Sequence, residues 1–212
     1  MTKASSGADR RPLLAGVAAV DVSPQTFPVI VSGSFFEKTS SVLLDPLHAR
    51  TLVLEAGGER VSITVVDIGM LPRDLVDRAK AQASEVTGIP VDRMVVSATH
   101  THAAPAAMGA LGSREDVAYA SWLPGRIAAS IEAAARCTAP AEIGWSAVDA
   151  PGHTHCRRWI THPDRMLEDP FGTRSVRAMM HPGYQNPDYV TPAGPVLSLI
   201  HISEPTRPER IS

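Results

Sequence analysis

Apolar positions along the first half of the chain follow a pattern that predicts strands and helices in alternation. The apolar run Leu13–Val22, closed by a Ser-Pro pair, predicts a buried strand. Two further segments, Thr51–Glu55 and Val61–Asp67, flank a glycine-rich turn and predict an antiparallel hairpin. Residues Gln25–Leu44 show no regular period, so we expect irregular structure between the first strand and the hairpin.

Helical spacing appears twice after the hairpin. A helix is expected from Pro72 to about Gly88, followed by a strand over Met94–Thr99. Glu115–Arg136 has a second helical period, in which Pro124 either kinks the helix or begins another one. The small and polar residues of Ala106–Arg114 predict a loop between these elements.

The last third of the chain is less regular. Ala141–Val148 predicts one more strand, and Asp149–Pro195 reads as a long proline-rich irregular region. We therefore predict an α/β fold, with a mixed β-sheet flanked by helices and a functional site at the C-terminal end of the Met94–Thr99 strand.

Composition narrows the function classes. The sequence has 20 basic and 22 acidic residues, which does not favour nucleic-acid binding. No apolar stretch is long enough to span a bilayer, and Met1–Arg11 is polar and precedes too short an apolar run for a secretory signal, so a cytoplasmic location is expected. Cys137 and Cys156 are expected to be free thiols. The oligomeric state is left open.

The most informative motif is His100-Thr101-His102, directly after the Met94–Thr99 strand. If the chain stays extended through Thr101, both imidazoles lie on one face and can converge on one point. Neutral imidazole is a common zinc ligand, but a catalytic zinc usually takes about three protein ligands, so the others must come from elsewhere. The alternative is one packed core histidine and one solvated histidine.

A second motif, His153-Thr154-His155, is followed by Cys156 and two arginines. These histidines are adjacent rather than spaced to close a metal site, so a polar loop is the competing interpretation. Arg157 and Arg158 are suited to holding a carbonyl, carboxylate or phosphate, because guanidinium presents a rigid fork of donors, although surface solvation is the alternative.

Three segments together resemble the neutral/alkaline ceramidase family. They occur in the family's order, and the resemblance runs from about Leu14 to Val196; the segments are Gly16–Pro24, Asp45–Arg50 and Ser97–Pro105. The His-Thr-His block is the most specific part. Cys156 stands where the family usually has asparagine, and Ala103-Ala104 also departs from its pattern.

The resemblance implies a zinc-dependent (Zn²⁺) amidase that hydrolyses ceramide, an N-acylsphingosine, to sphingosine and a fatty acid. By position, His100 resembles a zinc ligand, and His102 and Arg157 resemble catalytic residues that contact the substrate and stabilise the oxyanion. Gly33 resembles a substrate-binding position where the backbone approaches the ligand. The family's remaining zinc ligands and its active-site serine belong to later segments, so the resemblance implies an incomplete N-terminal portion of a larger catalytic domain.

The last residues of the chain do not continue the resemblance to the ceramidase family. Residues 197–212 resemble the in-frame translation of a sequencing-library adapter, with a genuine short strand and tail as the alternative. We therefore expect a disordered tail over residues 1–12, a partial ceramidase-like domain over 13–196 and a non-native tail over 197–212. An inactive fragment, or a metal-dependent hydrolase of another amide or ester on the same scaffold, remains an alternative function.

Overall fold

The structure is a computed structural model that describes residues 12–180, 182–183, 185–196 and 199–206. The disordered tail expected at residues 1–12 falls almost wholly outside these residues. The chain forms two compact units, one running to Glu142 and the other from Ile143 to Glu204. We describe each unit by itself, and the assignment of 13–196 to one catalytic domain stays a prediction.

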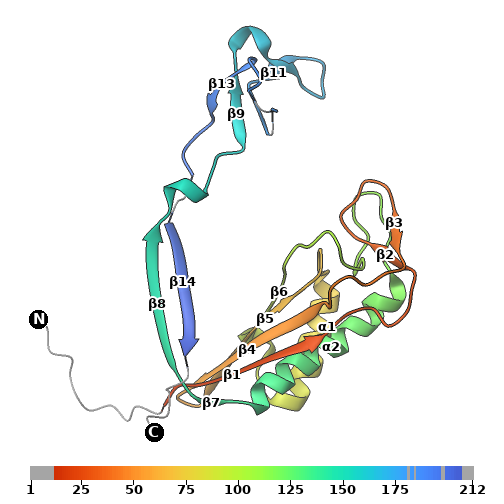
Figure 1. The fold of residues 1–212 in the computed structure, drawn as a ribbon, viewed down its shortest axis with the longest axis vertical. Helices are drawn as coiled ribbons and strands as arrows, with labels where there is room; N and C mark the ends of the chain where they lie inside the picture. Colours follow the sequence, from red (N-terminus) through yellow and green to blue (C-terminus); the bar gives the residue numbers. More distant parts are fainter. Residues whose placement is uncertain (1–11, 181, 184, 197–198, 207–212) are drawn as a thin grey trace, which may run out of the picture. The chain divides into compact units, whose positions relative to one another are not determined.

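The first unit is built on a mixed five-stranded sheet with the order β6-β5-β4-β1-β7 (Figure 1). Strand β4 pairs antiparallel with β1 and β5, whereas β5 and β6 run parallel and are connected through a helix. This confirms the predicted α/β class. The elements are β1 (Leu14–Asp21), β2 (Val29–Val31), β3 (Lys38–Ser40), β4 (His48–Ala56), β5 (Glu59–Val66), α1 (Arg73–Thr87), a 3-10 turn (Val91–Arg93), β6 (Met94–Ala98), α2 (Val117–Arg136) and β7 (Ala139–Pro140).

Capping residues define the ends of α1 and the start of α2. Helix α1 starts after Pro72 and ends at Gly88, whose φ of 70° is the left-handed conformation that glycine adopts readily. Helix α2 starts at Asp116, whose side chain accepts a hydrogen bond from the Tyr119 amide. The helix continues through Pro124 to Arg136, so Pro124 does not begin a second helix.

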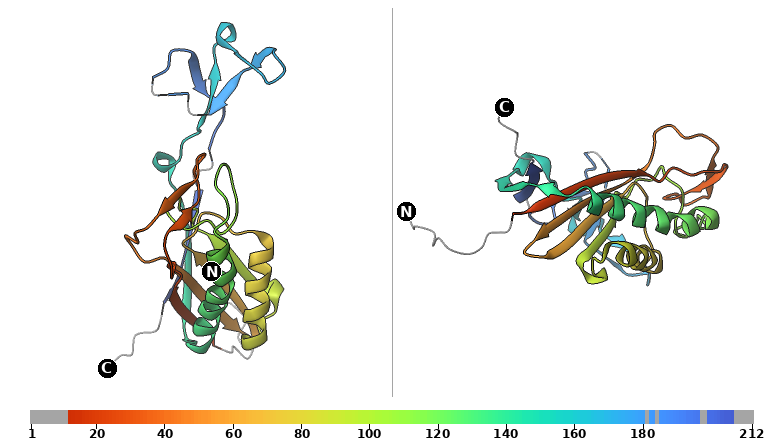
Figure 2. Two further views of the ribbon diagram at one scale, coloured as in Figure 1. Left: turned by 90° about the vertical axis from the view of Figure 1, so that its right-hand side faces the viewer. Right: turned by 90° about the horizontal axis from the view of Figure 1, so that it is seen from below.

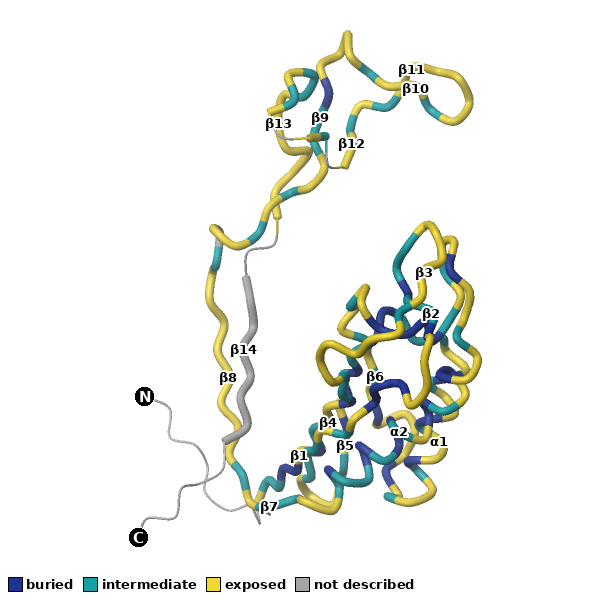
Figure 3. The backbone as a smooth tube through the Cα atoms, turned by 45° about the vertical axis from the view of Figure 1, so that its right-hand side comes forward, coloured by how far each residue is buried: buried dark blue, intermediate teal, exposed yellow. Residues whose placement is uncertain are grey.

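Helices α1 and α2 cover one face of the sheet (Figure 2). The core lies between these layers, and its largest fully buried side chains include Ile68, Leu75, Leu123 and Ile127. On the opposite face Val17 is 59% exposed. Figure 3 colours the backbone by burial and shows buried stretches among the strands of the sheet and in helices α1 and α2. The prediction of a buried β1 was therefore half right, because helices cover only one of the two apolar faces of this strand.

A small hydroxyl network is enclosed between the sheet and α2. Thr51 Oγ1 lies 2.8 Å from both Thr64 Oγ1 and Ser130 Oγ, and Ser130 in turn donates to the Ile127 carbonyl. All three hydroxyl residues are buried. A buried polar group without a hydrogen-bond partner lowers the free energy of unfolding. Loss of one of these three hydroxyls therefore removes a hydrogen-bond partner of another.

We expect Thr51→Val to lower the free energy of unfolding by about 1–3 kcal/mol, because it removes the described partner of the buried Thr64 hydroxyl. The double variant Thr51→Val/Thr64→Val should be destabilised by less than the sum of the two single variants, since it removes both partners of the bond. Urea unfolding followed by circular dichroism measures both effects. Additive losses would show that the two hydroxyls do not interact.

The second unit contains short strands in separate small sheets. Strands β12, β9 and β13 form one sheet, β10 pairs with β11, and β8 pairs with β14. The bounds are β8 (Glu142–Asp149), a 3-10 turn (Pro151–His153), β9 (Arg158–Thr161), a 3-10 turn (Pro163–Arg165), β10 (Leu167–Glu168), β11 (Arg174–Val176), β12 (Ala178–Met180), β13 (Tyr189–Pro192) and β14 (Leu199–Thr206).

The predicted hairpin, both helical segments, the Met94–Thr99 strand and the Ala141–Val148 strand are confirmed within a few residues. The two irregular regions are not wholly irregular, because Gln25–Leu44 contains β2 and β3 and Asp149–Pro195 contains several short strands. Of the expected non-native tail, residues 199–206 form β14, and the other residues from 197 to 212 lie outside the described residues. None of the described helices has the length and apolarity needed to cross a membrane.

Candidate functional site

The His-Thr-His motif begins where β6 ends. Strand β6 stops at Ala98, and the next two residues stay bonded to the end of β5 and the loop that follows it: the Thr99 amide donates to the Val66 carbonyl and the His100 amide to the Ile68 carbonyl. His100 then takes a φ of 63°, which turns the chain out of the extended conformation. The condition of an extended chain through Thr101 is therefore not met, and the two rings come together through a tight turn instead.

The ring of His100 is oriented by a backbone carbonyl. His100 Nδ1 lies 2.7 Å from the Gly69 oxygen, and because a carbonyl oxygen can only accept, Nδ1 carries the proton. In the neutral ring this leaves the lone pair on Nε2. Gly69 itself packs closely against neighbouring loops, since a Cβ at this position would overlap Ser32 Oγ and lie 3.2 Å from the Thr101 carbonyl oxygen.

The ring of His102 completes the pair. The two Nε2 atoms are 3.3 Å apart, and the rings meet edge to face with centroids 4.8 Å apart. Since His100 Nε2 has the lone pair, His102 Nε2–H donates this bond. Gly33, with a φ of 87°, lies against the other side of the His102 ring: a Cβ on Gly33 would come within 2.6 Å of the ring atoms Cγ and Nδ1. The structure thus brings together His100, His102 and Gly33.

Backbone hydrogen bonds fix the segments that carry these three residues. The Ser32 amide donates to the Ala104 carbonyl, and the Ala106 amide donates to the Ile30 carbonyl. Asp116 links the same loops to the start of α2, because its Oδ2 accepts from the Ile30 amide while its own amide donates to the Ala106 carbonyl. These hydrogen bonds therefore hold the loop that carries Gly33 next to the loop that carries His100 and His102.

An ion pair connects the two loops beyond the histidines. Arg114 donates from Nε and Nη2 to the two carboxylate oxygens of Glu37, at 2.8 and 2.7 Å, and its amide also donates to Glu37. These bonds lower the pKa of Glu37 to about 2 and raise the pKa of Arg114. The pair therefore stays charged over the whole neutral and mildly acidic range.

The side chains near the histidine pair fit only partly the zinc that the resemblance implies. His100 fits a zinc ligand, because its protonated Nδ1 donates to the Gly69 carbonyl and the lone pair of the neutral ring is on Nε2, which is the usual arrangement for a metal-binding imidazole. Within the part of the chain that the structure describes, no group of three or more His, Cys, Asp or Glu side chains is placed to hold a metal ion. A zinc site that uses His100 therefore stays a prediction.

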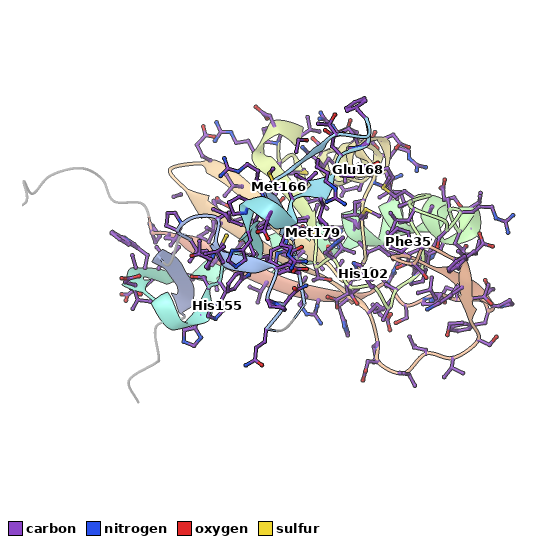
Figure 4. All side chains as sticks on the ribbon, turned by 90° about the horizontal axis from the view of Figure 1, so that it is seen from above. Phe35, His102, His155, Met166, Glu168 and Met179 are labelled. Atoms are coloured by element: carbon purple, nitrogen blue, oxygen red, sulfur yellow. The ribbon has the colours of Figure 1, made fainter. Side chains whose placement is uncertain are left out.

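The remaining predicted residues lie in the second unit. Arg157 is exposed and precedes β9, and with Arg158 and Cys156 it lines a shallow pocket that also includes Met180. His155 of the second His-Thr-His motif is exposed in the same unit (Figure 4). Arg157 belongs to the second unit and the histidine pair to the first, and the predicted role of Arg157 beside this pair stays a prediction.

Sequence reasoning missed three contributors to this site. Gly69 was not singled out, because nothing near it marks a carbonyl that must face a histidine thirty residues later in the chain. The Glu37–Arg114 pair joins residues that are far apart in sequence and carry no motif. Asp116 could have been found, because an aspartate just before a helical period is a standard N-terminal signal.

Comparison with known proteins finds solved structures of similar fold, and two of them are ceramidases. One is a crystal structure of neutral ceramidase from Pseudomonas aeruginosa and the other is a ceramidase complexed with C2; each has a TM-score of 0.57 and 18% sequence identity, over 75% of this chain. No protein-family profile and no curated protein matches the sequence. The chain spans 26% of the length of each ceramidase chain. It therefore has a fold that is similar to part of a neutral ceramidase.

Proposed function

We propose that this chain is part of a zinc-dependent amide hydrolase of the neutral ceramidase type, acting on an N-acylsphingosine. The observation that carries the proposal is the oriented His100–His102 pair at the end of β6, on a fold similar to that of neutral ceramidase. His100 would be one zinc ligand. The other ligands would come from outside the described residues, so the chain alone is not expected to turn over substrate.

The tautomer of His100 determines which histidine would bind the metal ion and which would donate a hydrogen bond to the substrate. The lone pair on His100 Nε2 cannot both accept the bond from His102 and bind a metal ion. Binding of a metal at His100 would therefore leave His102 Nε2–H free to donate to another acceptor close to that metal. We propose that His102 then donates to the substrate carbonyl oxygen as negative charge develops on it.

Zinc in such a site lowers the pKa of bound water and polarises a carbonyl group, which are the two aids that amide hydrolysis needs. The residues of this chain would orient the two imidazole rings and bind the substrate. Gly69 fixes the His100 ring, Gly33 gives the His102 ring its space and leaves the backbone open to a substrate, and we propose Arg157 as a further contact to the substrate oxygen.

We expect the purified chain to bind zinc, and His100→Ala to weaken the affinity by on the order of 10-fold or more, because it removes the ligand. Equilibrium dialysis with zinc measures this. The matched control is His153→Ala, an exposed histidine in the second His-Thr-His motif, which should leave the affinity unchanged. A chain cut after Val196 should also bind zinc normally if residues 197–212 play no part.

Equal zinc affinity in wild type and His100→Ala would contradict the assignment of the ligand. To test the proposed substrate class, a longer ceramidase-like protein that contains this segment is needed. A panel of N-acyl substrates would then decide the chemistry: turnover of short amides or esters without turnover of ceramide would contradict the proposed substrate while leaving the zinc site intact.

A further inference from the structure

We propose that the loops beside the histidine pair dock onto an uncharged lipid–water interface through the side chains of Phe35, Phe36 and Leu111, which we call the loop-tip patch. Phe35 and Phe36 lie between β2 and β3, and Leu111 lies between β6 and α2. Docking on a lipid surface is a separate property from hydrolysis. It can be measured without turnover and without zinc.

The side chains of the loop-tip patch are unusually exposed. Phe36 is 82% exposed, Phe35 is 77% exposed, and Leu111 is also exposed. Single exposed apolar residues are common on proteins, but two consecutive phenylalanines with an adjacent leucine form a local apolar surface. Aromatic and leucine side chains at loop tips are suited to the boundary between headgroups and acyl chains.

Backbone contacts hold these tips outward. A Cβ on Gly112 would overlap the Phe35 carbonyl oxygen, so the two loops touch through their main chains beside the patch. Ser113 Oγ donates to the Ser34 carbonyl at 3.4 Å, and the Glu37–Arg114 ion pair joins the same loops. The loops are thus fixed to each other by polar contacts that leave the phenylalanine rings without a role in packing.

The charges around the patch favour a neutral surface. Residues 33–44 and 106–114 contain three charged side chains, of which Glu37 and Arg114 neutralise each other in the ion pair. Lys38 is the remaining charge. Binding to anionic lipid typically needs a cluster of about 4–8 basic residues, which these loops do not have. The apolar tips therefore match a zwitterionic interface such as phosphatidylcholine.

The position of the patch connects it to the candidate site. Gly33 lies against the His102 ring, and Phe35 follows two residues later in the same loop. Figure 4 shows Phe35 and His102 within the same unit, on neighbouring loops. Docking through the patch would bring the histidine pair near the lipid surface.

The test is sedimentation of the full chain with phosphatidylcholine vesicles. We expect the wild-type chain to partition onto the vesicles, and Phe35→Ser/Phe36→Ser to lower the partition coefficient by on the order of 10-fold, because two aromatic rings are removed from the interface. Phe171→Ser is the matched control, since Phe171 is a 92% exposed phenylalanine in the second unit. It should bind like wild type.

Two further measurements sharpen the result. Binding should be insensitive to salt and should not increase with added phosphatidylserine, because the patch carries no basic cluster. A Phe36→Trp variant should show more fluorescence quenching by brominated phosphatidylcholine than wild type. Because the replaced rings are exposed, circular dichroism should report an unchanged fold in all variants.

The proposal is overturned if wild type does not bind the vesicles, if the double serine variant binds equally well, or if Phe171→Ser loses as much binding. Size-exclusion chromatography without lipid adds one more outcome. A wild-type dimer that the double serine variant abolishes would show that a second copy of the chain covers the patch, and this would also overturn the proposal. None of these outcomes depends on whether the chain hydrolyses an amide.

Discussion

Replacement of Gly16 by alanine is expected to lower the free energy of unfolding by about 3 kcal/mol, near the upper end of what overpacking usually costs. Gly16 is buried in β1, where the strand passes the C-terminal end of α2. An added Cβ would overlap the Ala134 carbonyl oxygen and lie 3.1 Å from both Thr138 Cγ2 and the Thr138 amide nitrogen. The obstacle is mainly backbone, so relief requires α2 to shift against the sheet.

The matched control lies in the same helix. Gly125 is exposed in α2, and a Cβ there would meet Gln82 Oε1 at 3.8 Å, an ordinary contact. Gly125→Ala should therefore raise the free energy of unfolding by about 0.5–1 kcal/mol, because alanine restricts the unfolded chain and favours the helix. Urea unfolding of both variants gives the comparison. Equal stability of Gly16→Ala and wild type would show that the close approach of β1 and α2 is absent in solution.

The sequence predicts the layers of the first unit well, for physical reasons that are local. The hairpin follows from two apolar segments around the Gly57-Gly58 turn, and α1 follows from its proline start and glycine end. The place of the histidine motif at the end of β6 follows from the same strand pattern. These features depend on neighbouring residues, which is the information that a single sequence contains.

Features that depend on distant residues were not predictable in the same way. The His100 conformation is set by hydrogen bonds to Ile68 and Gly69, more than thirty residues earlier in the chain, so the strand pattern of Met94–Thr99 could not show that the chain turns at His100. Burial of β1 failed for a related reason. An apolar strand predicts two faces that can be covered, and the pattern does not say which face the helices of this chain cover.

Gly33 was singled out from the sequence, but its contact with the His102 ring is visible only in the structure. The family resemblance assigned it to substrate binding, which stays a prediction, and the structure adds a neighbour that the sequence does not reveal. Gly33 is the residue against which the His102 ring packs. Its substitution therefore tests the geometry of the histidine pair directly, without removing either imidazole.

Gly33→Ala is expected to displace the His102 ring and break its 3.3 Å contact with His100, while the bond from His100 to Gly69 remains. The new Cβ would come within 2.6 Å of the ring, and a φ of 87° is unfavourable for alanine. Nitrogen-detected NMR of the imidazoles reports this separation: the Nδ1–H tautomer of His100 should persist, and the signals of His102 should change. In a longer protein that has the proposed activity, we expect kcat to fall by about 100-fold, because the proposed role of His102 depends on its position.

Gly57→Ala separates this geometric effect from backbone strain. Gly57 has a φ of 62° in the hairpin turn, and a Cβ there would have no heavy atom within 4 Å. Both variants should lose about 1–2 kcal/mol of unfolding free energy to the positive φ. Only Gly33→Ala should alter the His102 signals and the turnover of a longer protein. If both variants leave the imidazole spectra unchanged, the ring of His102 does not rest on Gly33, and the proposed division of work between the two histidines loses its structural basis.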